Sequence, residues 1–259
     1  MRICLSLLGL IYLTIAPAIA GSEPCERSLQ AISSSQIQEA RKYVYFLIGA
    51  PNAGKGTAGK PLAKALQLPY VSTGDILRGI IASGSALGQK IAPIIASGQN
   101  ISTDDLKPIL TEWINSQSPS LGFVMDGSPR KLIEALALEE IIQQAGYKGI
   151  RAIYFKVSSP TILERASGRV ICSAKSCGQS FHRSFIPPAQ EGLCDLCNSP
   201  LIRRSDDQSE EIVLNRTRTF ETDTVPVIEY FRSKGLLFEL NTEQSPKAVL
   251  NDLFGVVFQ

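Results

Sequence analysis

The sequence predicts an α/β protein, a three-layer sandwich in which helices cover both faces of a central parallel sheet. Short apolar runs at residues 44–48, 123–125, 152–157 and 236–240 alternate with longer helix-forming stretches. This alternation is typical of parallel strands joined by helical crossovers. The chain has 259 residues, of which 44% are hydrophobic and 19% charged. It can therefore bury a sizeable core, which excludes a wholly disordered chain.

The length of the chain limits the number of domains, and its charge limits the classes of partner. Domains contain roughly 100–200 residues, so 259 residues indicate one large domain or a domain with insertions. The chain has 26 Lys and Arg against 24 Asp and Glu, a formal net charge of +2. This near balance gives no electrostatic reason to expect a nucleic-acid partner. No period of about 20–50 residues recurs, which excludes repeat folds.

The N-terminus has the pattern of an export signal. Arg2 precedes an apolar run over residues 3–16, and the small-residue cleavage pattern Pro17-Ala18-Ile19-Ala20 follows. The sequence predicts a signal peptide over residues 1–20 and, over residues 21–40, a linker or a loosely docked helix. The mature protein is then exported, periplasmic or secreted, with no membrane association after cleavage. Two alternatives stay open: an uncleaved anchor, although a span needs about 20 apolar residues, and a misassigned start before a cytoplasmic protein.

The first strand leads into a glycine-rich loop. Residues 42–48 predict a buried strand, and Gly49-Ala50-Pro51-Asn52-Ala53-Gly54-Lys55-Gly56-Thr57 and helix-forming residues 58–66 follow it. Glycines in such a loop allow the backbone angles that turn successive N–H groups toward an anion at a helix N-terminus. Lys55 adds a charge that can reach the β- and γ-phosphates, and the Thr57 hydroxyl can reach a magnesium ion. The loop therefore predicts a site for nucleotide phosphates.

An aspartate and several arginines follow at the ends of predicted elements. Residues 122–125 predict a strand that ends in Asp126. The arginines near element ends are Arg78, Arg130, Arg165, Arg169, Arg204 and Arg216. A single such arginine is usually a solvated surface residue. Together with a phosphate loop, however, they suit phosphoryl transfer between two nucleotides, because two polyanions must then approach each other.

From about residue 43 to the C-terminus the sequence resembles adenylate kinase, in the long form with a cysteine-bearing lid. The motifs that carry the resemblance are GxPxxGKGT at 49–57, STGDxLR at 72–78, DGxPR at 126–130, RxxGR at 165–169 and RxDD at 204–207. The resemblance implies a nucleoside monophosphate kinase domain over residues 41–259. Within it, a helical acceptor-binding insertion over residues 73–102 and a lid over residues 170–205 would close over the substrates. The implied reaction is reversible phosphoryl transfer from Mg-ATP to a nucleoside monophosphate, most simply AMP, by a monomer.

The resemblance also implies the role of each candidate site residue. The implied catalytic residues are Lys55, Asp126, Arg130, Arg169, Arg204 and Arg216. The implied ATP site comprises Gly49, Asn52, Ala53, Gly54, Lys55, Gly56, Thr57, Arg165 and Gln244. The implied acceptor site comprises Thr73, Arg78, Asn100, Ile101, Ser102, Gly127, Ser128, Pro129, Arg130, Glu134, Arg204 and Arg216. In these sets Lys55 would contact the transferring phosphate, Asp126 would hold Mg²⁺ through water, and Arg165 would stack on the ATP base.

Three positions depart from the family's usual residues. Asn52 stands in place of a glycine, Ser128 in place of an aromatic residue and Glu134 in place of a glutamine. Asn adopts positive φ more readily than most residues, so Asn52 can keep the loop geometry. A carboxylate only accepts hydrogen bonds, so Glu134 is expected to change the base preference of the acceptor site. Alternatively it turns to solvent or binds protonated, and AMP stays preferred. A catalytically impaired nucleotide-binding protein also stays open.

Four cysteines predict a metal site in the lid. Cys172, Cys177, Cys194 and Cys197 form two close pairs within the spacing range of structural zinc sites. The four-residue gap in the first pair is wider than the family's usual two, and an export signal would favour two disulfides instead. The prediction is structural Zn²⁺, with disulfides or free thiols as alternatives. His182 lacks a second ligand at matching spacing, so it is expected to pack or hydrogen-bond within the lid.

Overall fold

The computed structural model describes residues 32–174, 177–204 and 207–259. These residues belong to one compact unit, 32–259. The predicted signal peptide and most of the predicted linker, residues 1–31, lie outside the described residues, so export stays a prediction. Among the helices of the described ranges, none is long and apolar enough to cross a membrane.

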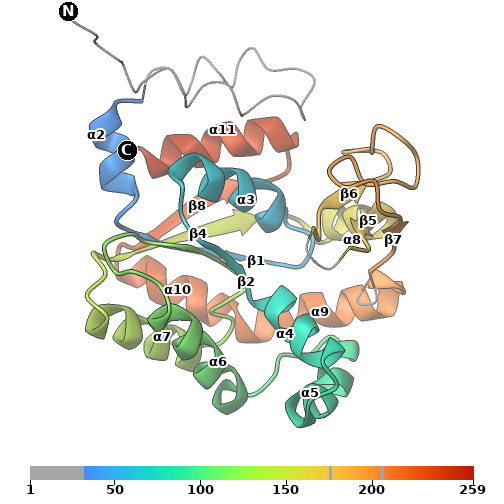
Figure 1. Cartoon of the computed structure of the whole chain (residues 1–259), viewed down its shortest axis with the longest axis horizontal. Helices are drawn as coiled ribbons and strands as arrows, with labels where there is room; N and C mark the ends of the chain where they lie inside the picture. The colour runs from blue at the N-terminus through green and yellow to red at the C-terminus, as the bar shows by residue number, and fades with distance from the viewer. Residues whose placement is uncertain (1–31, 175–176, 205–206) are drawn as a thin grey trace, which may run out of the picture. The chain divides into compact units, whose positions relative to one another are not determined.

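A five-stranded parallel sheet forms the centre of this unit, in the order β2-β3-β1-β4-β8 (Figure 1). The strands are β1 (Val44–Gly49), β2 (Tyr70–Ser72), β3 (Val124–Asp126), β4 (Ile150–Lys156) and β8 (Leu237–Asn241). Each predicted strand is confirmed to within two residues at its ends. Because β1 is the central strand, the loop that follows it lies at the middle of the sheet's carboxyl edge, where ligands bind in such sheets.

Helices cover both faces of the sheet (Figure 1). On one face α3 (Lys55–Leu66) packs against α11 (Pro246–Val257). On the other face α7 contacts α6 and α10, and α10 contacts α9. The other helices of this unit are α2 (Ser34–Ala40) before β1, α8 (Ser159–Gly168) after β4, and α6 (Thr103–Asn115), α7 (Leu132–Gln144), α9 (Glu210–Asp223) and α10 (Val225–Ser233). The predicted three-layer α/β architecture is confirmed.

The core surrounds the central strand. The four residues from Val44 to Leu47 are fully buried, as expected of a parallel strand with helices on both faces. Phe123 packs edge-on against Trp113 and Tyr147, with ring centroids 5.1 and 5.4 Å away, a geometry that aromatic pairs prefer. This core holds the carboxyl edge of the sheet rigidly in place.

Two smaller units project from the sheet. The first contains α4 (Thr73–Ala82) and α5 (Ala86–Ala96), directly after β2. The second is a three-stranded antiparallel sheet in the order β6-β5-β7, formed by β5 (Arg169–Cys172), β6 (Ser180–His182) and β7 (Leu201–Ile202). Apart from Arg169, the first residue of β5, these elements lie within the predicted insertions over 73–102 and 170–205. Their exact boundaries and their closing movement stay predictions.

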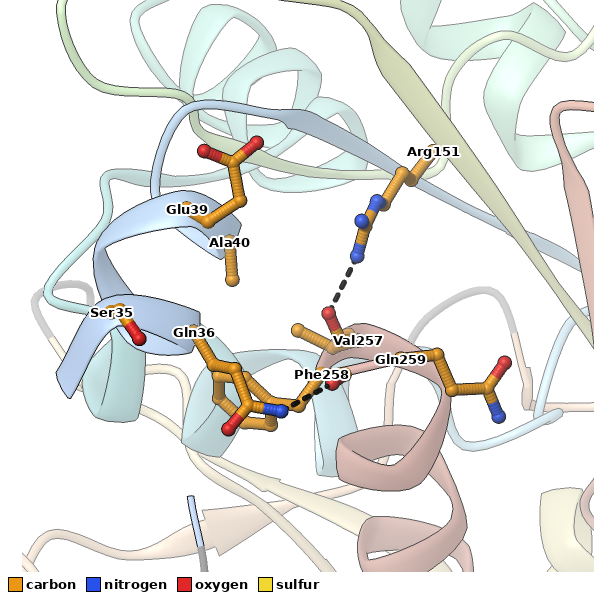
Figure 2. Close-up of a pocket in the computed structure, with 8 residues that line it drawn as sticks. All are labelled: Ser35, Gln36, Glu39, Ala40, Arg151, Val257, Phe258 and Gln259. Carbon is orange, nitrogen blue, oxygen red and sulfur yellow. Dashed lines mark hydrogen bonds between the residues drawn. The ribbon is translucent and has the colours of Figure 1, made fainter. Parts of the chain in front are cut away.

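A cavity of about 370 Å³ lies where β1 and β4 begin, between α2 and the end of α11 (Figure 2). Arg151 donates to the carbonyl of Val257, and Gln36 donates to the carbonyl of Phe258 at 3.0 Å. Ligands of parallel sheets bind beyond the carboxyl ends of the strands. This cavity lies at the amino ends, so it is not the candidate site.

Helix α7 offers a direct test of the core. Leu138 is 3% exposed and belongs to the core, whereas Leu136 on the same helix is 48% exposed. Leu138→Ala should lower the free energy of unfolding by about 2–5 kcal/mol, because it removes buried methyl groups and leaves a cavity. Leu136→Ala, the matched control, should change it by no more than about 0.5 kcal/mol. Urea denaturation measures both, and equal losses would contradict this orientation of α7.

Candidate active site

The glycine-rich loop joins β1 to α3 and needs two residues in the left-handed region. Asn52 has φ of 63° and Gly54, the N-cap of α3, has φ of 90°. Asn and Gly are the residues that adopt this region at least cost. At the start of the loop, a Cβ on Gly49 would lie 2.9 Å from the carbonyl oxygen of Phe155. The local sequence therefore explains both the shape of the loop and its close approach to β4.

Lys55 is a buried lysine with one acidic and several basic neighbours. Its Nζ donates to the carbonyls of Gly49 and Ala50, at 2.8 Å each. Burial lowers the pKa of Lys55 to about 8, although the negative charge of Asp126 opposes this shift. The remaining influences on its pKa come from the positive charges of Arg130, Arg216 and Arg169. The structure thus brings five of the six predicted catalytic residues into one electrostatic environment.

Asp126 lies at the end of β3, beside the start of α3. A Cβ on Gly56 would lie 3.4 Å from Asp126 Oδ2, so the carboxylate faces the phosphate loop. Tyr70 Oη donates to the same oxygen at 2.8 Å. Carboxylate and hydroxyl oxygens suit Mg²⁺, so Asp126 and Thr57 are the residues that could hold this ion. Tyr70 is not among the predicted site residues, because only the pairing of β2 with β3 brings it to Asp126.

Asp207 gathers two of the predicted phosphate-binding arginines. Its carboxylate is fully buried. Arg169 Nε donates to Oδ2 at 2.6 Å, and Arg216 Nη1 donates to Oδ1 at 2.9 Å. The backbone N–H of Asp207 also donates to the carbonyl of Arg204 at 3.2 Å. The RxDD motif had marked this aspartate, but its role as the shared partner of two arginines was not predicted.

The predicted acceptor residues converge on Arg130. Its Nε donates to the carbonyl of Gly127 at 2.7 Å, and its Nη1 donates to Asn100 Oδ1 at 3.0 Å. Asn100 in turn donates to Asp223 Oδ2 at 2.9 Å, a contact between residues 123 positions apart that the sequence does not predict. The guanidinium is therefore held from two sides at the carboxyl edge of the sheet.

Glu134 is buried rather than turned to solvent. Its Oε2 accepts a hydrogen bond from the backbone N–H of Arg130 at 2.8 Å. Burial raises the pKa of Glu134, and hydrogen bonds from the N–H groups of Arg130 and Lys131 oppose this shift. Of the alternatives predicted for this side chain, solvent exposure is wrong. Its carboxylate instead caps the turn at the start of α7.

The other acceptor residues lie along the same edge. Thr73 Oγ1 donates to Ser128 Oγ at 3.0 Å, and both side chains are buried. Arg78 forms an ion pair with Asp75 on α4. The peptide bond between Ser128 and Pro129 is cis. The carbonyl of Ile101 accepts a hydrogen bond from Lys131, and Ser102 is the N-cap residue of α6. Ser102 thus has a structural use that its predicted binding role did not include.

Arg165 joins the phosphate loop to the residues after β8. Its guanidinium donates to the carbonyls of Asn52, at 3.5 Å, and Thr242. Gln244 instead donates to the carbonyl of Asn241 and to the carboxylate of Asp252 on α11. After β8, it is therefore the carbonyl of Thr242 that Arg165 contacts. The contact of the Gln244 backbone with the ATP base stays a prediction.

The four predicted cysteine ligands lie together in the lid. All four Sγ atoms are within 4.8 Å of one another, and none is disulfide-bonded. The Cys172–Cys197 and Cys177–Cys194 Sγ pairs are 3.3 and 3.6 Å apart. Four thiolates on zinc, at Zn–S of about 2.3 Å, lie about 3.8 Å apart. The donor set and its size therefore fit tetrahedral zinc.

His182 packs and hydrogen-bonds in the lid, as predicted. Its ring stacks on Phe185 with centroids 4.4 Å apart. Nδ1 accepts from the backbone N–H groups of Ser184 and Phe185, each at 3.1 Å. Nε2 lies 3.4 Å from the carbonyl of Glu164, so both ring nitrogens are in use outside the cysteine cluster.

Comparison with known proteins agrees with this geometry. The family model described as "Adenylate kinase" matches residues 47–236. The adenylate kinase of Pseudothermotoga lettingae is 35% identical over 207 residues, which cover 80% of this chain and 94% of that protein. Those of Fervidobacterium nodosum and Desulfitobacterium hafniense are 37% and 39% identical, over 81% and 80% of this chain and 95% and 94% of the relatives. The predicted family, fold and enzyme class are confirmed: the chain belongs to the adenylate kinase family of nucleoside monophosphate kinases.

Proposed function

We propose that this chain catalyses the reversible reaction of Mg-ATP with AMP to give two ADP. Membership of the family supports phosphoryl transfer to a nucleoside monophosphate. The observation that carries the proposal is the gathering of Lys55, Asp126 and three arginines at the carboxyl edge of the sheet. The ATP phosphates would occupy the loop at 49–57, and the monophosphate would bind near Thr73, Arg78 and Arg130.

Catalysis would come from positioning and charge neutralisation. Lys55 would exchange its contacts with the Gly49 and Ala50 carbonyls for phosphate oxygens. Arg130, Arg169 and Arg216 would neutralise the charge that spreads over the transferring phosphoryl group. The leaving and attacking oxygens would lie in line, so neither a covalent intermediate nor a general base is needed. Arg204, beside Asp207, would join them as the lid closes.

Two metal ions would assist. Mg²⁺, when bound, would neutralise charge between the β- and γ-phosphates; Asp126, oriented by Tyr70, and Thr57 would hold it. A structural Zn²⁺ would be held by Cys172, Cys177, Cys194 and Cys197. In the described part of the lid the hydrophobic cluster is small: Val170 and Phe181 are buried beside Cys172 and Cys194, and Ala174, Cys177 and Leu201 pack against them. A segment with so small a core gains stability from a bound metal.

AMP is the acceptor that the geometry supports best. A carboxylate that reads guanine must be free to accept from two adjacent donors of the base. One oxygen of the Glu134 carboxylate, Oε2, already accepts from the backbone N–H of Arg130 at 2.8 Å. We infer that Glu134 supports the turn of the acceptor site instead of reading the base.

The reaction is tested by supplying ADP alone with Mg²⁺ and measuring ATP with luciferase. The wild type should form ATP, and Lys55→Ala should lower turnover at least about 100-fold, because the lysine charge acts where charge shifts in the transition state. The affinity for AMP should change little, because Arg78 and Arg130 bind the acceptor. No ATP above the Lys55→Ala background would instead favour a nucleotide-binding protein without kinase activity.

Acceptor choice is tested by comparing kcat/KM for AMP and GMP in the wild type and in Glu134→Gln. AMP should be strongly preferred by both proteins, because the carboxylate is held by the backbone. Glu134→Ala should weaken every acceptor alike, since it removes the support of the turn. A wild-type preference for GMP that Glu134→Gln reverses would show that Glu134 reads the base.

The lid metal is tested by thermal unfolding with a chelator and, separately, with a reductant. The chelator should lower the melting temperature, because metal binding contributes directly to folding. The reductant should change it little. Cys197→Ser, which removes one ligand, should lower the melting temperature without chelator and lose most of the response to it. Stability to chelator combined with sensitivity to reductant would replace zinc with disulfides.

A further inference from the structure

The side chain of Asn52 is a buried amide without a partner. Asn52 is 9% exposed, and among the described residues neither its Nδ2 nor its Oδ1 has a hydrogen-bond partner. Buried polar groups are nearly always paired, since an unpaired one keeps the full cost of leaving water. An amide without a protein partner in a phosphate-binding loop is therefore available to bind a ligand.

Backbone geometry explains only in part why asparagine occupies position 52. The φ of 63° at Asn52 restricts the position to residues that tolerate the left-handed region. Glycine meets that requirement at lower cost than asparagine. The loop conformation therefore excludes most side chains, but it gives no reason for an amide.

The position of Asn52 indicates which part of the nucleotide it meets. Asn52 precedes Lys55 by three residues in the loop, and Lys55 would contact the transferring phosphate. On its other side, the Asn52 carbonyl accepts a hydrogen bond from Arg165 at 3.5 Å, and Arg165 would stack on the base. Asn52 thus lies between the groups proposed for the two ends of ATP.

We propose that Asn52 Nδ2 donates a hydrogen bond to a phosphate oxygen of ATP, on the side of the loop nearest Arg165. Phosphate oxygens only accept hydrogen bonds, so the amide nitrogen is the atom that binds them. Asn52 is then a nucleotide-binding residue through its side chain as well as its backbone. This inference rests on the proposed function, because it requires ATP in this loop.

The test measures binding of ATP, inorganic triphosphate, adenosine and AMP by calorimetry. Asn52→Gly removes the amide and keeps the backbone freedom, so the Kd of ATP and of triphosphate should rise about tenfold. Asn52→Asp keeps the shape but sets a carboxylate against the phosphates, so both values should rise about 100-fold. Adenosine and AMP should bind as to the wild type. Asn198→Gly is the matched control, since Asn198 is exposed in the lid with φ of 60°, and it should change none of these values.

Three results would overturn the inference. If Asn52→Gly binds ATP as tightly as the wild type, Asn52 only shapes the loop. If adenosine affinity falls while triphosphate affinity does not, the amide meets the sugar or base. If Asn52→Asp does not weaken triphosphate binding, the amide does not face phosphate. Failure of the proposed function is distinct, because the wild type itself would then form no ATP from ADP.

Discussion

The pairing of the buried Asp207 carboxylate with two arginines is the interaction on which the proposed phosphate site depends. It holds Arg169, at the start of β5, and Arg216, on α9, at a single point. Two guanidinium groups repel each other, so a shared anion is needed to keep them together before substrate arrives. A buried charge of this kind is tolerated only when it is paired and hydrogen-bonded. Asp207 therefore keeps two of the arginines proposed to bind phosphate close together, and it joins β5 to α9.

The parallel sheet supplies the second part of the site. Because β1 is central and β3 is its neighbour, the phosphate loop and Asp126 emerge side by side at one edge. The next strand, β2, adds Tyr70, whose hydroxyl orients the carboxylate of Asp126. Lys55 meanwhile bonds to backbone carbonyls of its own loop, contacts that phosphate oxygens can replace. The core thus positions Lys55 and Asp126 and also Arg216 on α9, while α4 contributes Arg78 and β5 contributes Arg169.

The acceptor side shows how departures from the family's usual residues can be absorbed. Ser128, in place of an aromatic residue, is buried and accepts a hydrogen bond from Thr73. Glu134, in place of glutamine, supports the backbone at Arg130. Asn52, in place of glycine, adopts the required positive φ but leaves its amide unpaired. Ser128 and Glu134 therefore have hydrogen-bond partners within the protein. The amide of Asn52 has none among the described residues, and it is the group proposed above to bind a phosphate oxygen.

Sequence alone determined four strands of the central sheet (β1, β3, β4 and β8), the phosphate loop and the family, because these depend on local periodicity, on glycine backbone angles and on the spacing within short motifs. It also identified the four cysteines, whose clustering follows from their spacing. Tertiary structure alone decided that Tyr70 donates to Asp126, that one aspartate pairs with both Arg169 and Arg216, and that Arg165 donates to the carbonyl of Thr242. Each of these contacts joins residues from different elements. Strand order and side-chain packing bring them together, and neither can be read from distances along the chain.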